Sequence, residues 1–173
     1  KGDIWISAVL YFGLGLVIIT ILLAAGLPVI NKLRDKNVII QSKGVMHELD
    51  QNIREVVKEG PGSQRIVTVN IKKGYLQLDN SRSLIVWHYN NSQVIISEIG
   101  IPVFEGKLTI LTLNSTVKGN YNIEVYTNYT GFANITKDAA KPSTILGITD
   151  LVIRNEGLDQ NSLVKVSVSQ TNK

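Results

Sequence analysis

The chain contains no cysteine, one methionine, two histidines and four prolines among its 173 residues. The absence of cysteine excludes a disulfide scaffold, an iron–sulfur cluster, a thiolate zinc site and a cysteine nucleophile. Aromatic residues make up only 6% of the chain. The net charge of +4 is spread along the sequence without the basic stripe that phosphate contacts require, so we expect no nucleic-acid partner.

Residues that carry catalysis are also scarce. His47 and His88 lie far apart in the sequence, and neither belongs to a metal-binding spacing. The segment 100–107 superficially resembles a phosphate-binding loop, but its spacing is one residue too long. The carboxylates are scattered over polar faces and expected turns. We therefore expect no enzyme activity, no catalytic residue, no metal and no cofactor.

Charge is missing altogether from Ile4 to Ile30. As a helix this run rises roughly 40 Å, which is enough to cross a bilayer. The core of a secretory signal peptide is shorter, so we expect no cleavage after the small residues 24–26. Gly26 and Pro28 predict a kink or a local loosening of the helix, because proline cannot donate the helical hydrogen bond.

A second helical stretch, residues 31–59, follows without a break in the pattern. Its apolar residues recur at steps of three and four, which predicts one amphipathic helix. Asp50 and Arg54 are one turn apart, and we expect them to pair on the exposed face. The segment 60–62, Gly-Pro-Gly, predicts the end of the helix.

From Ser63 onward, apolar and polar residues alternate with a period of two, which predicts short antiparallel strands. Strands are expected around 67–71, 76–78, 121–125 and 164–168, with 84–89 and 94–96 as central strands and 137–144 as a long loop. Turns are predicted at Lys73-Gly74, Asn90-Asn91, Asn80-Ser81, Gly119-Asn120 and Glu156-Gly157. This spacing favours a sandwich or barrel-like domain of roughly seven or eight strands.

The predicted fold class is therefore α+β, with two parts. Residues 1–60 form a long N-terminal helix, apolar over 4–30 and amphipathic over 31–59. Residues 61–173 form an antiparallel β-sandwich or barrel-like head. The whole would have the shape of a lollipop.

Two signals disagree on where the head resides. Four N-x-[S/T] sequences, beginning at Asn90, Asn114, Asn128 and Asn134, all lie in the expected head. They indicate either a glycosylated external domain or simply an Asn- and Thr-rich composition. By contrast, the three basic residues at 32, 34 and 36 follow the apolar run, and the positive-inside rule would place the head in the cytoplasm.

The start of the chain resembles a known family. Lys1-Gly2-Asp3-Ile4, followed at once by a long uncharged run, is similar to archaeal class III signal sequences, those of type IV pilin-like precursors. The resemblance implies that a prepilin peptidase cuts between Gly2 and Asp3. Many pilins and archaellins carry a glutamate a few residues into the apolar run, and residues 5–10 have none here.

This resemblance also implies a function. Such pilins wait in the membrane and then pack helix against helix in the core of an extracellular filament that serves adhesion. The expected core residues are Ile4, Trp5, Val9, Tyr11, Phe12, Val17, Ile19 and Leu22. The implied partners are copies of the same chain, the membrane before assembly, the prepilin peptidase and the pilus assembly machinery. The alternatives are a membrane-anchored minor pilin or surface β-domain protein, and an archaellin.

Overall fold

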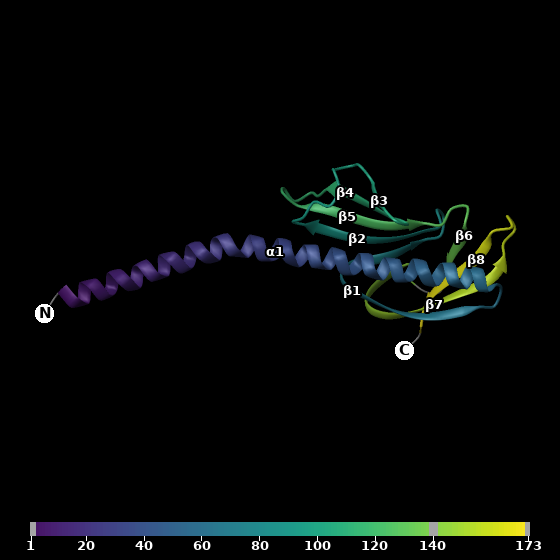
Figure 1. Ribbon diagram of the computed structural model, residues 1–173, viewed down its shortest axis with the longest axis horizontal. Coiled ribbons are helices and arrows are strands. Elements are labelled where there is room, and N and C mark those ends of the chain that lie inside the picture. Colours follow the sequence, from purple (N-terminus) through teal and green to yellow (C-terminus); the bar gives the residue numbers. More distant parts are fainter. Residues whose placement is uncertain (1–2, 139–141, 172–173) are drawn as a thin grey trace.

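A computed structural model describes residues 3–138 and 142–171. One long helix, α1 (Asp3–Glu59), projects from a β-rich head, as Figure 1 shows. The head contains eight strands: β1 (Gln64–Asp79), β2 (Leu84–Ser92), β3 (Val103–Glu105), β4 (Leu108–Asn114), β5 (Tyr121–Asn128), β6 (Ala133–Lys137), β7 (Thr144–Leu158) and β8 (Val164–Gln170). The α+β class is therefore confirmed.

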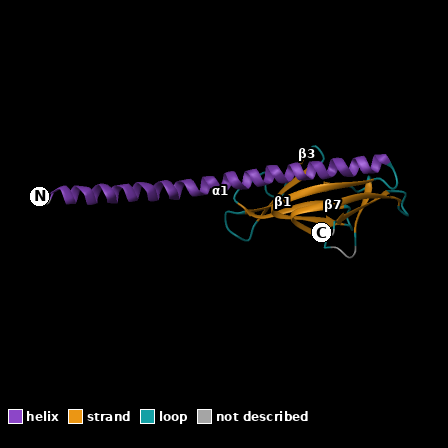
Figure 2. Ribbon diagram, turned by 90° about the horizontal axis from the view of Figure 1, so that it is seen from below, coloured by secondary structure: helices purple, strands orange, loops and turns teal. Residues whose placement is uncertain are grey.

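The strands form a single sheet in the order β3-β4-β5-β2-β1-β7-β8-β6. Every pair is antiparallel except β6 with β8, which is parallel. The expected sandwich is corrected, because the strands of the described residues form one sheet, and this sheet is not a closed barrel, because β3 and β6 are its two edges. The second layer is instead a helix: Figure 2 shows the C-terminal half of α1 lying along the sheet.

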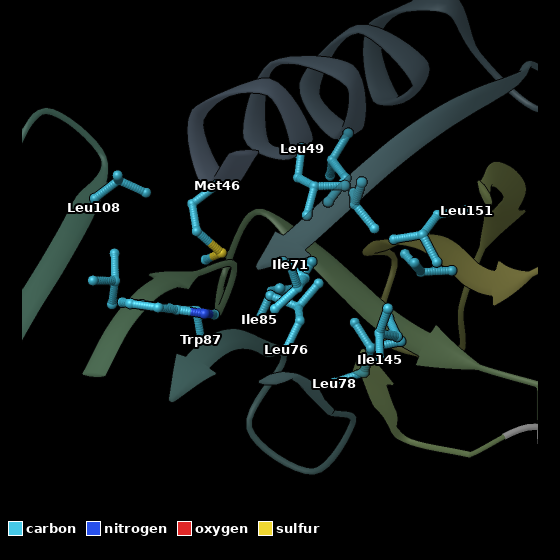
Figure 3. Packing of buried hydrophobic residues seen from close by; sticks show 14 of the residues in the cluster. Met46, Leu49, Ile71, Leu76, Leu78, Ile85, Trp87, Leu108, Ile145 and Leu151 are labelled. Atoms are coloured by element: carbon cyan, nitrogen blue, oxygen red, sulfur yellow. The ribbon is translucent and has the colours of Figure 1, made fainter. Parts of the chain in front are cut away.

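The core lies between α1 and one face of the sheet. The helix buries Met46, Leu49 and Ile53, and each of these side chains is at most 1% exposed. Figure 3 shows Met46 and Leu49 pointing toward sheet residues that include Leu76 and Trp87. The helical steps of three and four between buried positions place them on one stripe. Residues 35–59 of α1, called the docked half below, are therefore part of the head's core.

The helix ends where the sequence predicts. Gly60 has a φ of +94°, a left-handed conformation that glycine adopts without a steric penalty. The hydroxyl of Ser63 donates to the main-chain oxygen of Val56 at 2.8 Å, and the side-chain amide of Asn155 donates to the same oxygen at 3.1 Å. These bonds satisfy a carbonyl that the helix itself leaves without a partner.

Three of the five predicted turns are irregularities inside long strands. Lys73-Gly74 lies within β1, Asn90-Asn91 within β2 and Glu156-Gly157 within β7, each at a shift in strand register. Asn80-Ser81 and Gly119-Asn120 are turns or loops, as predicted. The shifts are bulges, which bend and twist a strand without ending it.

One predicted central strand is absent. Residues 94–96 are not in a strand. The amide of Gln93 donates to the carboxylate of Asp35 at 2.9 Å, and the amide of Val94 donates to the hydroxyl of Ser92 at 3.1 Å. Because these donors are taken by side chains, the chain leaves the sheet after Ser92. Of the predicted loop 137–144, residues 139–141 lie outside the described residues.

Candidate functional site

The first candidate is the exposed segment, which we define as residues 5–34 of α1. Its large hydrophobic side chains, from Trp5 to Leu33, are between 48% and 77% exposed. No side chain in this segment is buried, and exposed residues occupy every face of the helix. The largest apolar patch on a typical monomer covers only about 300–600 Å², whereas here exposed apolar side chains continue along the helix from Trp5 to Ile30. Over residues 5–30 the helix carries no charge and is apolar all round, and such a helix requires an apolar environment from outside the chain.

All of the core residues predicted from the sequence, except Ile4, lie in the exposed segment. Trp5, Val9, Tyr11, Phe12, Val17, Ile19 and Leu22 are all 54% exposed or more. Ile4 and Asp3 lie in α1, but their side chains are outside the description, and Gly2 lies outside the described residues. The segment is also long and apolar enough to cross a membrane.

The exposed segment is continuous with the docked half of the helix. α1 runs through Gly26 and Pro28 without interruption, and Figure 1 shows it curving on its way to the head. Cβ atoms built at Gly13, Gly15 and Gly26 meet nothing within 4 Å. Small residues of this kind allow another helix to approach closely.

Because α1 is one unbroken helix, the orientation of the head is coupled to that of the exposed segment.

Asp35 is the first buried residue along α1 from Trp5 onward, and it fastens the helix where it leaves the sheet. Its carboxylate accepts hydrogen bonds from the hydroxyl of Tyr89 at 2.6 Å, from the amide of Gln93 at 2.9 Å and from the ammonium of Lys73 at 3.3 Å. Burial alone would raise the pKa of Asp35, but the three donors outweigh it and lower the pKa below 3.8. Burial and the bond to Asp35 raise the pKa of Tyr89.

A second polar cluster fastens the docked half near its end. Asp50, expected on an exposed face, is only 7% exposed, and Arg54 pairs with it at 2.9 Å. The guanidinium of Arg54 lies 4.6 Å from the ring centroid of Phe132 and 6.0 Å from that of Tyr129. Burial, and next the charge of Asp50, raise the pKa of Tyr129. The expected pair is confirmed, but its position is corrected, because the loop after β5 covers it.

The four glycosylation candidates are not equivalent. Asn90, Asn114 and Asn128 are exposed. The side-chain amide of Asn134 instead donates to Asp159 at 2.9 Å and is partly buried. Since that amide nitrogen is the atom that a glycan would occupy, Asn134 is the least suited of the four to modification.

The outer face of the sheet carries a polar groove that contains His88. Its Nδ1 lies 3.3 Å from a carboxylate oxygen of Glu124, and its ring stacks on Tyr75 with centroids 4.9 Å apart. The hydrogen bond with His88 lowers the pKa of Glu124. His47 is exposed on the helix. Within the described ranges, no group of histidine and acidic residues has the geometry to hold a metal ion.

Sequence reasoning found the exposed segment but missed Asp35 and Tyr129. A signal for Asp35 was present, because an acid occupies a position on the same helical stripe as Val38, Ser42 and Leu49. Tyr129 lies in a connection between strands, where the period-two pattern offers no signal. Compared with family models, curated proteins and solved structures, the chain has no match.

Proposed function

We propose that this chain is the structural subunit of an archaeal type IV-like pilus, polymerising through the exposed segment into an extracellular adhesion filament. One observation carries the proposal: a single uninterrupted helix is bare on every face over residues 5–34 and forms part of the head's core beyond them. A simple membrane anchor needs no fixed relation to its head. A regular helical filament does, because each copy must present the same surfaces in the same orientation.

The energetics favour assembly among copies. Burying one large aliphatic side chain contributes about 1.5–3 kcal/mol, and the exposed segment carries many of them. Trp5, Tyr11 and Phe12 offer the largest contact areas. Contacts of this kind, repeated by a rotation that does not close, generate a fibre. The heads would then form the outer layer, with glycans on the exposed asparagines.

The remaining roles follow from the resemblance. Before assembly the exposed segment would reside in the cell membrane, after a prepilin peptidase has cut between Gly2 and Asp3. The assembly machinery would then move the subunit into the filament. The chain would act by attachment and not by catalysis, and would need no cofactor.

Two substitutions test the proposal. Ile19→Asp places a carboxylate among packed helices, and we expect it to abolish filaments in cells that express it. Ile148→Asp is the matched control, because Ile148 is 68% exposed on the head. Filaments sheared from the cells are imaged by electron microscopy, and their main protein is identified by mass spectrometry. Normal fibres from Ile19→Asp would contradict a buried helical core.

A second variant separates assembly from membrane insertion. Gly13→Leu makes the segment more apolar, so insertion is retained, but the added side chain prevents close helix approach. We expect normal amounts of the variant in the membrane and few or no filaments. If the variant assembles as well as the native chain, helix packing at Gly13 is not part of the assembly.

The main alternative is a single-span surface protein whose head binds a ligand. The outer groove beside His88 and Glu124 is the feature that favours it. This protein would be scarce, would be extracted fully by mild detergent, and would not dominate sheared fibres. An archaellin would instead form filaments that depend on a rotary motor for their function.

A further inference from the structure

We propose that a ring of basic residues around α1 binds anionic lipid headgroups while the chain resides in the membrane. The ring, called the collar below, consists of Lys32, Arg34, Lys36, Lys72 and Lys118, all exposed. The proposal rests on the membrane stage of the function proposed above. It adds the chemistry of the lipid that the subunit contacts there.

Two grooves flank the helix where it meets the sheet, and both combine cations with apolar side chains. One groove, of about 650 Å³, is lined by residues that include Val29, Lys32 and Lys36 together with the loop 119–121. Lys118 directly precedes that loop. The other groove, of about 480 Å³, lies between α1 and β1. Its lining includes Ile30, Leu33, Arg34 and Lys72.

The charge of both grooves is of one sign. Neither is lined by an aspartate or a glutamate among the described residues. The nearby acid, Asp35, is buried and already accepts three hydrogen bonds, one of them from Lys73. The collar cations are therefore available to a negatively charged partner from outside the chain.

The position of the collar selects a lipid surface as that partner. The uncharged run from Ile4 to Ile30 rises roughly 40 Å, against about 30 Å for the hydrocarbon core of a bilayer. Residues that follow the run therefore lie at the level of the phosphates. Lysine and arginine extend their charged ends toward headgroups while their stems remain on apolar surface. Val29, Ile30 and Leu33 continue the apolar surface into the grooves, so the acyl chain of a bound lipid would contact apolar side chains there.

Spin-labelled lipids measure this preference directly. The full-length chain is placed in nanodiscs, and electron spin resonance compares how a phosphatidylglycerol label and a phosphatidylcholine label associate with the protein. We expect the anionic label to be favoured by about fivefold, the gain from one effective cation at an anionic surface. The preference should fall when salt is added, because salt screens exposed charges.

Two matched triple variants locate the effect. The collar variant Arg34→Gln, Lys36→Gln, Lys72→Gln should bring the preference close to unity. The control variant, which replaces Lys58, Lys107 and Arg154 by glutamine, removes the same charge from exposed positions that line neither groove, and should leave the preference unchanged. Circular dichroism of each variant confirms that it is folded.

Three results would overturn the proposal. They are equal association of the two labels with the native chain, an unchanged preference in the collar variant, and displacement of the anionic label by inorganic phosphate at matched ionic strength. The last would assign the grooves to a soluble anion. Filament formation is scored separately: normal fibres without lipid preference refute only the lipid proposal, and lipid preference without fibres refutes only the filament proposal.

Discussion

Replacing Asp35 by alanine tests how the helix is fastened to the head. The substitution removes the carboxylate that accepts two hydrogen bonds, one from the hydroxyl of Tyr89 at 2.6 Å and one from the amide of Gln93 at 2.9 Å. A hydrogen bond to a charged group contributes about 1.5–3 kcal/mol. The pairing with Lys73 is discounted, because that side chain is 32% exposed and water replaces its partner.

Two bonds at the low end of this range predict a loss of about 3 kcal/mol in the free energy of unfolding. The low end applies to the amide of Gln93, because Gln93 lines an open groove at the collar that water can enter. The hydroxyl of Tyr89 is buried, so about 3 kcal/mol is the smaller end of the expected loss. With a urea dependence of about 2 kcal/mol per molar, the unfolding midpoint should fall by about 1.5 M.

Fluorescence provides the assay. The chain has two tryptophans, and Trp5→Phe leaves Trp87, which is fully buried, as the reporter of the head. Urea titrations in mild detergent compare Asp35→Ala with Glu48→Ala, an exposed acid on the same helix that should change the midpoint little. Equal midpoints for the two variants would refute the idea that the Asp35 network fastens the helix.

The same network predicts a dependence on pH. The pKa of Asp35 is lowered in the folded chain. The contribution of Asp35 to the free energy of unfolding is therefore fully present above its ordinary pKa of 3.8. The contribution is lost as the pH falls through the lowered value, because protonation then favours the unfolded chain. The difference between the native chain and Asp35→Ala should therefore be constant near neutrality and should shrink in acid. A difference in stability that stays constant at pH values below the lowered pKa of Asp35 would contradict this role of its carboxylate.

Three further predictions concern the head. Gly74→Ala should cost more than about 2 kcal/mol, because φ is +73° and a Cβ would lie 2.0 Å from a main-chain oxygen of β2; a near-normal melting temperature would contradict this. Ile53→Ala should cost about 2–5 kcal/mol, because it leaves a cavity, whereas Ile21→Ala in the exposed segment should change head unfolding by less than about 0.5 kcal/mol; urea titration compares the two. Asn134 should carry no glycan in mass spectra of the native protein, since its amide is bonded to Asp159; a glycan there would show that this bond is not maintained.

The turn predictions show where local pattern is insufficient. Lys73-Gly74 and Glu156-Gly157 carry glycines with positive φ, a conformation that serves a tight turn and a bulge equally well. Which of the two forms depends on whether a neighbouring strand continues to pair beyond the glycine. In β1 it does: Ile71 pairs with Gly147, and Leu76 then pairs with Ile145. Sequence spacing carries no information about that neighbour.

The polar clusters on the helix show a related limit. A charged residue on an amphipathic helix is normally assigned to the solvent face, and that assignment is wrong for Asp50, which is covered by the connection after β5. A buried acid is stable only when donors reach it. For Asp35 the donors come from β1, β2 and the segment that follows β2, all far away in the sequence. Only the folded chain brings them together.

The long helix, its uncharged front half and its end at Gly60 could all be predicted from the sequence, because helix periodicity, charge and stop signals are local properties. The period-two pattern also predicted that the rest of the chain is β-rich. Two features became visible only in the folded chain: α1 forms a second layer against a single open sheet, and the helix changes from exposed to buried at Asp35. Those outcomes depend on which strands pair and on what covers the helix, and both are contacts between residues distant along the chain.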